Sequence, residues 1–159
     1  DLSQIILRNG GDIDKYVGDE IFAIFKGQNK ENNALKSAIE MQHAVDKINK
    51  ENKTKIAIGI GINTGPAVLG SMGSSIRKDF TAIGDNVNIG ARLCSNAAKG
   101  EIVVSETTYI KLKNFFEFEK KGDFSLKGKS QPVPIYRALI EHAKDNSENP
   151  DQAGFASRA

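Results

Sequence analysis

The strongest constraint on the fold lies in residues 20–25, EIFAIF, where every residue after the first is apolar. Residues 13–17 form a second apolar-rich run, and Gly18 and Asp19 alone separate the two runs. Two β-prone runs joined by a Gly-Asp pair predict a tight hairpin. Because the second strand is apolar on both faces, we expect it to lie centrally in a sheet. The carboxylate at the turn of this hairpin then needs an explanation.

The next segments predict a helix and a strand with two unlike faces. Between residues 29 and 50, apolar side chains recur every three or four positions, as on an amphipathic helix that covers one face of a sheet. In residues 55–62, KIAIGIGI, isoleucine alternates with alanine and glycine. Such a strand has one apolar face and one nearly bare face, so we expect another part of the molecule to approach its glycines closely.

Periodicity, capping residues and turn residues mark the other elements. They are a helix that ends before Gly10, strands at 67–70 and 80–83 flanking an exposed hairpin arm at 71–79, a helix at 86–98, a strand at 101–104, a helix capped by Ser105, and strands at 115–119 and 135–140. This order predicts one α+β domain over residues 1–142, with a mixed or antiparallel sheet and helices on one face. Residues 143–159 are polar and free of repeats, and we expect them to form a tail or linker.

Composition limits the partners of this domain. The chain has 159 residues and a net charge of +2, which suits one domain with a real core but gives no broad electrostatic attraction for nucleic acid or anionic membrane. No apolar run reaches the length of a bilayer span, and the N-terminal residues do not resemble a secretion signal. Cys94 is the single cysteine, and we expect it to be a buried structural thiol. These features predict a cytoplasmic domain, either alone or as the cytosolic part of a larger sensor or membrane protein.

Two groups of residues suggest chemistry on a phosphate or a metal ion. Asp19 offers carboxylate oxygens to a hard cation such as magnesium, although aspartate at a turn is more often structural. Lys15 interrupts a strand that should be half-buried. Asn88 and Arg92 are four residues apart on a predicted helix, so an amide and a guanidinium share one face and suit a phosphate ligand. Taken alone, such an arginine would more often pair with a surface carboxylate.

The segment LKGKS at residues 126–130 is a poor match to a phosphate-binding P-loop. Five residues separate Gly122 from Gly128, where the P-loop has four, and Pro132 and Pro134 oppose the helix that should follow. We reject the P-loop interpretation. Lys127 remains a candidate for a phosphate contact, because a lysine in a glycine-bracketed loop can act as a point charge.

Three longer motifs resemble the catalytic domain of class III nucleotide cyclases, in the same order and at similar intervals. They are IDKYVGDEIFAIF, IGIGINTGPAVLGSMGSSIRKDFTAIGDNVNIGARL and FSLKGKSQPVPIYR, and the similarity extends to about His142. The resemblance implies a ferredoxin-like α+β domain that forms a head-to-tail homodimer with composite sites between subunits. It further implies a signalling enzyme, an adenylate cyclase that converts ATP into 3′,5′-cyclic AMP and pyrophosphate.

The resemblance also implies a role for each candidate residue. Asp19 would be one of two aspartates that hold a pair of magnesium or manganese ions. Lys15 and Thr81 would read the purine edge, and such a pair resembles adenylate cyclases, whereas guanylate cyclases resemble a glutamate and cysteine pair. For the rest of the nucleotide, the implied contacts are Asn88 to the ribose, Arg92 to the α-phosphate in the transition state, and Lys127 to the triphosphate.

The beginning of the chain departs from the family pattern. The family's first strand carries the second metal aspartate in a Phe-x-Asp-Ile-x-x-Phe-Thr type motif, and no segment of this chain matches it. The sequence is then either an N-terminally shortened version of a longer protein or a degenerate copy of the domain. In both cases we expect a cyclase domain that lacks its first strand and has apolar surface and unpaired backbone groups where that strand would lie. Such a chain can be inactive by itself.

Two alternatives stay open. The segment VGDEIFAIF also resembles the Gly-Gly-Asp-Glu-Phe hairpin of diguanylate cyclases, but Val17 replaces the first glycine and TAIGDNVN fits the class III pattern. The other alternative is a regulatory module that binds nucleotide or dimerises without turnover. Metal-dependent formation of cyclic AMP by a protein extended upstream distinguishes the three.

Overall fold

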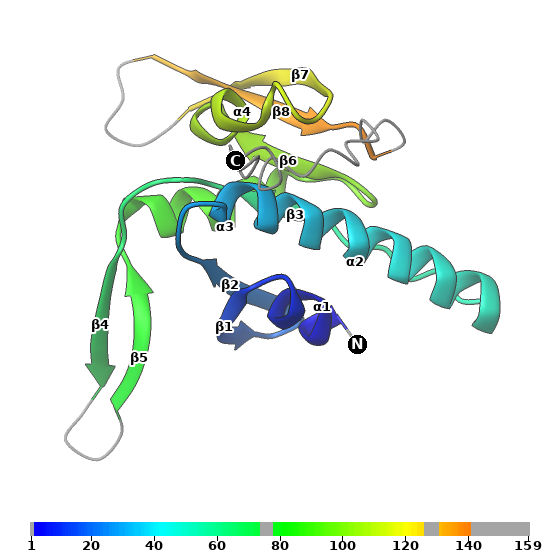
Figure 1. Cartoon of the computed structure of the whole chain (residues 1–159), viewed down its shortest axis with the longest axis horizontal. Coiled ribbons are helices and arrows are strands. Elements are labelled where there is room, and N and C mark those ends of the chain that lie inside the picture. The colour runs from blue at the N-terminus through cyan, green and yellow to red at the C-terminus, as the bar shows by residue number, and fades with distance from the viewer. Residues whose placement is uncertain (1, 74–77, 126–130, 141–159) are drawn as a thin grey trace, which may run out of the picture.

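The computed structural model describes residues 2–73, 78–125 and 131–140 (Figure 1). Helices and strands are mixed along the chain, as the α+β prediction requires. The elements are α1 (Leu2–Arg8), β1 (Gly11–Val17), β2 (Glu20–Phe25), α2 (Lys30–Asn52), β3 (Ile60–Ile62), β4 (Val68–Gly73), β5 (Lys78–Ile83), α3 (Asp85–Asn96), β6 (Ile102–Ser105), α4 (Glu106–Leu112), β7 (Phe118–Phe124) and β8 (Val133–Ala138).

The largest sheet is mixed and has the strand order β3-β6-β8-β7, with β3 parallel to β6 and the other pairs antiparallel. Helices cover both of its faces, rather than one as the sequence predicted. Ile102 and Val104 of β6 pack with α2 and α4 in one core cluster, whereas Val103 packs with Leu93 of α3 in another. Because successive residues of a strand point to opposite faces, β6 needs a cover on each side.

The glycines before and within β3 explain how α3 reaches its face of the sheet. A Cβ added at Gly61 would overlap the backbone of Leu93 and Cys94, and one added at Gly59 would lie 2.8 Å from the carbonyl oxygen of Ala97. The predicted close approach to the bare face of this strand is therefore confirmed, and helix α3 makes it.

Two hairpins form separate two-stranded sheets, β1-β2 and β4-β5. In Figure 1 the β4-β5 hairpin extends from the body as an arm, and the β1-β2 hairpin lies with α1 on the other side of α2 from β6, β7 and β8. The prediction that residues 20–25 form a central strand is therefore wrong for this chain, because β2 pairs with β1 alone in the part of the chain described here.

Several element bounds differ from those predicted. Strand β3 covers only the last three residues of KIAIGIGI, since its partner β6 begins after the turn at Gly100. Strand β7 begins at Phe118 rather than at residue 115, because Phe115 and Phe116 still bond to the last turn of α4 through Leu112. The predicted tail at 143–159 and the tip of the arm at 74–77 lie outside the described residues.

Candidate active site

Lys15 and Thr81 meet across two hairpins that are far apart in the sequence. The Lys15 Nζ donates a hydrogen bond to the Thr81 Oγ1 at 2.6 Å. Lys15 comes from β1 and Thr81 from β5, and the two strands contact each other. The Lys15 Nζ also lies 5.4 Å from the centre of the Phe22 ring, which favours a cation at this position. The structure thus brings together the two residues that the sequence proposes as purine readers.

Asp14 joins this pair and is a residue that the sequence interpretation missed. Its Oδ2 accepts a hydrogen bond from the Thr81 Oγ1 at 2.7 Å, and the Lys15 Nζ lies 3.1 Å from the same oxygen. Its Oδ1 accepts from the backbone N–H of Ala82 at 3.0 Å. One signal in the sequence could have identified Asp14. It lies directly before Lys15, and two adjacent polar residues are unusual in a strand expected to be half-buried.

The electrostatics of Asp14 agree with these contacts. The Asp14 side chain is 3% exposed, whereas the Lys15 side chain is 38% exposed. Burial by itself would raise the pKa of Asp14, but hydrogen bonds from Thr81, from the Ala82 N–H and from Lys15, together with the lysine charge, hold that pKa below its ordinary value. The negatively charged carboxylate of Asp14 therefore lies buried next to the partly exposed side chain of Lys15.

Asp19 lies at the turn between β1 and β2 and is exposed. Gly18 before it has a φ of 62°, a left-handed conformation that glycine adopts without strain. Asp19 and Glu20 both line the cavity described below. Over residues 2–73, 78–125 and 131–140, no cluster of three or more His, Cys, Asp or Glu side chains could hold a metal ion. Asp19 thus presents an exposed carboxylate at this turn, which is the type of ligand that a hard divalent cation prefers.

Asn88 and Arg92 lie on the exposed face of α3, one helical turn apart. The Arg92 Nη2 donates to the carbonyl oxygen of Ser125 at 3.1 Å, and the guanidinium lies 4.8 Å from the centre of the Phe124 ring. These contacts hold Arg92 against the last residue of β7 and the residue after it, Ser125, which precedes Lys127 by two positions. Lys127 itself lies outside the described residues.

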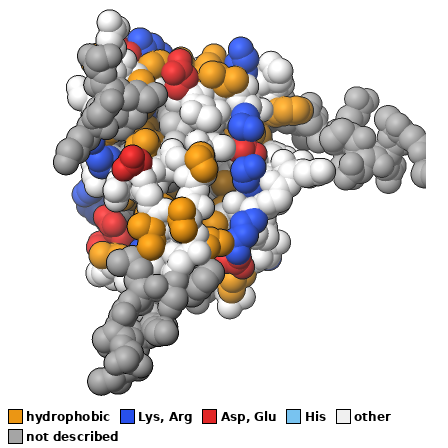
Figure 2. All heavy atoms as spheres, turned by 90° about the vertical axis from the view of Figure 1, so that its left-hand side faces the viewer, with side chains coloured by type: hydrophobic (Ala, Val, Ile, Leu, Met, Phe, Trp, Pro, Cys, Tyr) orange, Lys and Arg blue, Asp and Glu red, His pale blue; other side chains and the backbone are white. Residues whose placement is uncertain are grey.

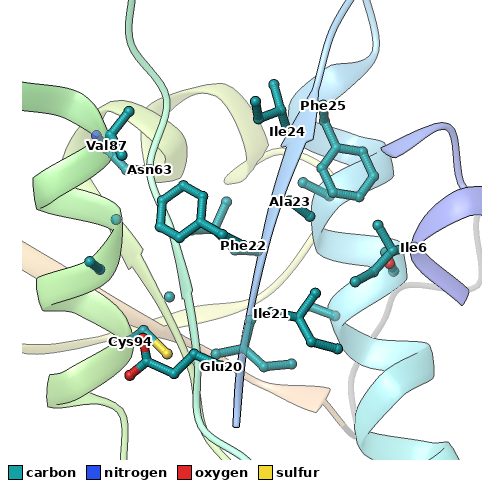
Figure 3. Close-up of a pocket in the computed structure, with 18 of the residues that line it drawn as sticks. Ile6, Glu20, Ile21, Phe22, Ala23, Ile24, Phe25, Asn63, Val87 and Cys94 are labelled. Carbon is teal, nitrogen blue, oxygen red and sulfur yellow. The ribbon is translucent and has the colours of Figure 1, made fainter. Parts of the chain in front are cut away.

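An apolar cavity of about 490 Å³ lies between β2 and β3, with α3 also in its wall. Figure 3 shows Phe22 and Ile24 projecting from β2 toward the side where α3 lies, and Ile21 and Phe25 projecting toward Ile6 of α1. Among the described residues, no strand pairs with the second edge of β2 or with the second edge of β3. The predicted apolar surface and the predicted unpaired strand edges are therefore present, and both line this cavity.

Cys94 faces the same cavity and is half-buried rather than fully buried as expected. Its Sγ donates to the carbonyl oxygen of Gly59 at 3.5 Å. Burial and the nearby charge of Glu20 raise the pKa of the thiol, which keeps it protonated. Cys94 therefore takes a packing position at the contact between α3 and the segment before β3.

The candidate residues form two groups within one chain. The first group is Lys15, Thr81 and Asp14, and the second is Asn88 and Arg92; no hydrogen bond or ion pair joins the two groups in the described part of the chain.

The side of the molecule that carries the arm shows hydrophobic side chains among Lys and Arg (Figure 2). Val68 at the base of the arm is 68% exposed and Tyr16 near the β1-β2 turn is 61% exposed.

Comparison with known proteins gives a consistent result. Residues 9–138 match the family described as the adenylate and guanylate cyclase catalytic domain. Over 140 residues the chain is 37% identical to an adenylate cyclase of Anabaena cylindrica, in an alignment that covers 80% of this chain and 28% of that protein. The chain thus spans less than a third of the length of such curated relatives.

Solved structures share the fold. The crystal structure of the adenylyl cyclase CyaB from P. aeruginosa matches with a TM-score of 0.80 and 35% identity, over 87% of this chain and 76% of that chain. The crystal structure of the guanylyl cyclase Cya2 matches with a TM-score of 0.75 and 29% identity, over 86% of this chain and 74% of that chain. The predicted α+β fold and the resemblance to class III nucleotide cyclases are both confirmed.

Proposed function

The chain belongs to the family of adenylate and guanylate cyclase catalytic domains, and from this premise we propose that it uses ATP and forms 3′,5′-cyclic AMP and pyrophosphate. The hydrogen bond between Lys15 and Thr81 carries this proposal. An ammonium group only donates hydrogen bonds, and the N1 of adenine accepts one, whereas the N1 of guanine carries a hydrogen. A lysine at the base-reading position therefore favours adenine.

Asn88 and Arg92 supply the contacts proposed for the ribose and the α-phosphate. Attack of the ribose 3′ oxygen on the α-phosphorus concentrates negative charge on the phosphate oxygens, and a guanidinium placed there stabilises that charge. Asn88, one turn before Arg92 on the same face of α3, orients the ribose through its amide. Lys127 contacts the triphosphate in this proposal.

Asp19 is the proposed ligand of magnesium or manganese. Two bound ions would lower the pKa of the 3′ hydroxyl and neutralise the leaving pyrophosphate. The chain supplies one of the two aspartates that the family resemblance implies, since no segment of its sequence matches the motif of the other. We therefore place the activity in a polypeptide that brings a second acidic ligand to Asp19.

We propose that two copies combine head to tail, because no hydrogen bond or ion pair joins the base-reading residues to Arg92 in the described part of one chain. The exposed side chains of Val68 and Tyr16 suit a contact between copies. Each composite site would then take Lys15 and Thr81 from one copy and Asn88 and Arg92 from the other. We propose no nucleic acid or membrane partner for this domain.

A cytoplasmic location, in a signalling protein, belongs to the same proposal. In the described part of the chain, no helix has the length and apolar character needed to cross a membrane. A regulatory module that binds nucleotide or dimerises without turnover remains the second candidate, which the product assay below distinguishes from the enzyme. A diguanylate cyclase has less support, since the matched family is that of adenylate and guanylate cyclases.

The test is a product assay on this chain and on a polypeptide that continues upstream of Asp1. Each is incubated with ATP or GTP and with Mg²⁺ or Mn²⁺, and the products are separated and identified by mass. We expect metal-dependent cyclic AMP from the longer polypeptide. Cyclic dinucleotide from GTP would support the diguanylate cyclase, and nucleotide binding without any product would support the regulatory module.

A further inference from the structure

A β-bulge in β1 directs two consecutive side chains to the same partner. The register with β2 shifts between Ile13 and Lys15, so Asp14 is the extra residue at this point. In a regular strand, neighbouring side chains point to opposite faces, but a bulge re-aims one of them. As a result, both Asp14 and Lys15 reach the Thr81 Oγ1, at 2.7 Å and 2.6 Å.

The two oxygens of Asp14 have different partners. Oδ1 accepts from the backbone N–H of Ala82 at 3.0 Å, which fixes the carboxylate relative to β5. Oδ2 accepts from the Thr81 hydroxyl and lies 3.1 Å from the Lys15 Nζ. If Asp14 only linked β1 to β5, the contact of Oδ1 with the Ala82 N–H would be enough. The contacts of Oδ2, in contrast, involve Thr81 and Lys15, the two base-reading side chains.

This arrangement fixes the direction of the hydrogen bonds of Thr81. A hydroxyl has one hydrogen and two lone pairs. The hydrogen of Thr81 is donated to Asp14, and one lone pair accepts from Lys15. The second lone pair of the Thr81 oxygen remains, so this oxygen can accept one more hydrogen bond but cannot donate one.

We propose that Asp14 is a positioning residue that makes Thr81 an obligatory acceptor and thereby selects adenine over guanine. The 6-amino group of adenine donates hydrogen bonds, and the oxygen at the same position of guanine only accepts them. A Thr81 oxygen that can only accept therefore pairs with the first and is repelled by the second. This inference rests on the proposed function, and it assigns the discrimination of the base to a residue that does not contact it.

The substitution Asp14→Asn tests the role with little change in shape. If the amide oxygen keeps the Ala82 N–H, the amide nitrogen faces Thr81 and donates, which frees the threonine hydrogen to point toward the base. Asp12→Asn is the matched control, because Asp12 lies on the same strand, is 66% exposed and pairs with Lys26. Both variants are made in the cyclase-active polypeptide and checked for folding by circular dichroism.

The measured quantity is the ratio of kcat/KM for ATP to kcat/KM for GTP. We expect Asp14→Asn to lower this ratio about tenfold, which is about 1.4 kcal/mol, while Asp12→Asn leaves it unchanged. In the Thr81→Val background, Asp14→Asn should have no further effect on the ratio, since the acceptor it orients is gone. An Asp14→Asn variant that folds and keeps its preference overturns the role of Asp14 and leaves the proposed function standing. An unaltered protein that does not discriminate between the nucleotides overturns both.

A second measurement uses the unaltered protein and does not depend on a variant that folds. Purine riboside triphosphate keeps the N1 acceptor of adenine but lacks the 6-amino group. If Thr81 accepts from that group, kcat/KM for this analogue should be about tenfold below that for ATP. Equal values for the two nucleotides would show that Thr81 takes no hydrogen from the base and would overturn the inference.

Discussion

The guanidinium of Arg92 lies 4.8 Å from the centre of the Phe124 ring. A hydrogen bond from its Nη2 to the Ser125 carbonyl, 3.1 Å long, fixes it further. The guanidinium therefore lies over the ring and one of its N–H groups is bonded to the backbone, while its other N–H groups have no hydrogen-bond partner among the described residues. An arginine held in this way is positioned before a ligand arrives, which lowers the entropy lost when it meets a phosphate.

The first prediction concerns this arginine. Arg92→Ala should lower kcat by roughly 10² to 10³, the size expected for removal of one donor to developing charge, with a smaller change in KM. Steady-state kinetics with ATP measure both constants. Arg8→Ala is the control, since Arg8 is an exposed arginine on α1 that pairs with Glu40. Equal losses in kcat and in apparent affinity for Arg92→Ala would indicate ground-state binding instead.

The second prediction concerns the metal ligand. Asp19→Ala should reduce metal-dependent turnover by more than about a hundredfold, because an ion contributes several kcal/mol to stabilisation of the transition state. The melting temperature should change little, since Asp19 is exposed at a turn. Asp123→Ala removes another exposed aspartate, which pairs only with Lys120 among the contacts described, and serves as the control. Unchanged turnover across a Mg²⁺ titration would contradict the role of Asp19.

The third prediction concerns the choice of nucleotide. The double change Lys15→Glu and Thr81→Cys places an acceptor where the N1 hydrogen of guanine would lie and removes the acceptor for the 6-amino group of adenine. We expect the ratio of kcat/KM for ATP to that for GTP to fall by at least about tenfold. Competition kinetics with both nucleotides in one reaction measure the ratio directly. If the ratio stays as it was, neither residue reads the base.

The sequence predicted the parts of this site that depend on local pattern. The hairpin with Asp19 at its turn and the helical spacing of Asn88 and Arg92 follow from turn residues and periodicity, and the helices and hairpins were found within a few residues of their bounds. Asp14 was missed because its role comes from a β-bulge and from contact with a strand 67 residues later. Neither is visible in the local alternation of apolar and polar residues.

The position of β2 was predicted wrongly for a related reason. An apolar strand has to be covered, but its sequence does not say whether the neighbour is present in the same chain. In this structure, the edge of β2 that does not pair with β1 faces the cavity between β2 and β3. The pairing of β2 with β1 alone satisfies only one of its edges.

The fourth prediction concerns these open edges. Backbone N–H groups of β2 and β3 that β1 and β6 do not pair should exchange with solvent rapidly in this chain. In a polypeptide extended upstream that supplies a strand between them, the same amides should become protected. Hydrogen exchange followed by mass spectrometry compares the two proteins, with β8 as an internal reference, since β8 pairs on both sides. The same exchange at β2 and β3 in both proteins would show that no strand enters this cavity.

The fifth prediction concerns the contact between β3 and α3. Gly61→Ala should destabilise the protein by about 1 to 3 kcal/mol, because the added methyl group would overlap the backbone of Leu93 and Cys94, which cannot move without shifting the helix. Gly90→Ala is the matched substitution within α3, where the nearest atom to an added Cβ is the Asn63 Cβ at 3.9 Å. Because alanine favours a helix over glycine by roughly 0.5 to 1 kcal/mol, this variant should be more stable than the unaltered protein. Urea unfolding measures both free energies, and changes of the same sign would contradict the close packing of α3 on the glycine face of β3.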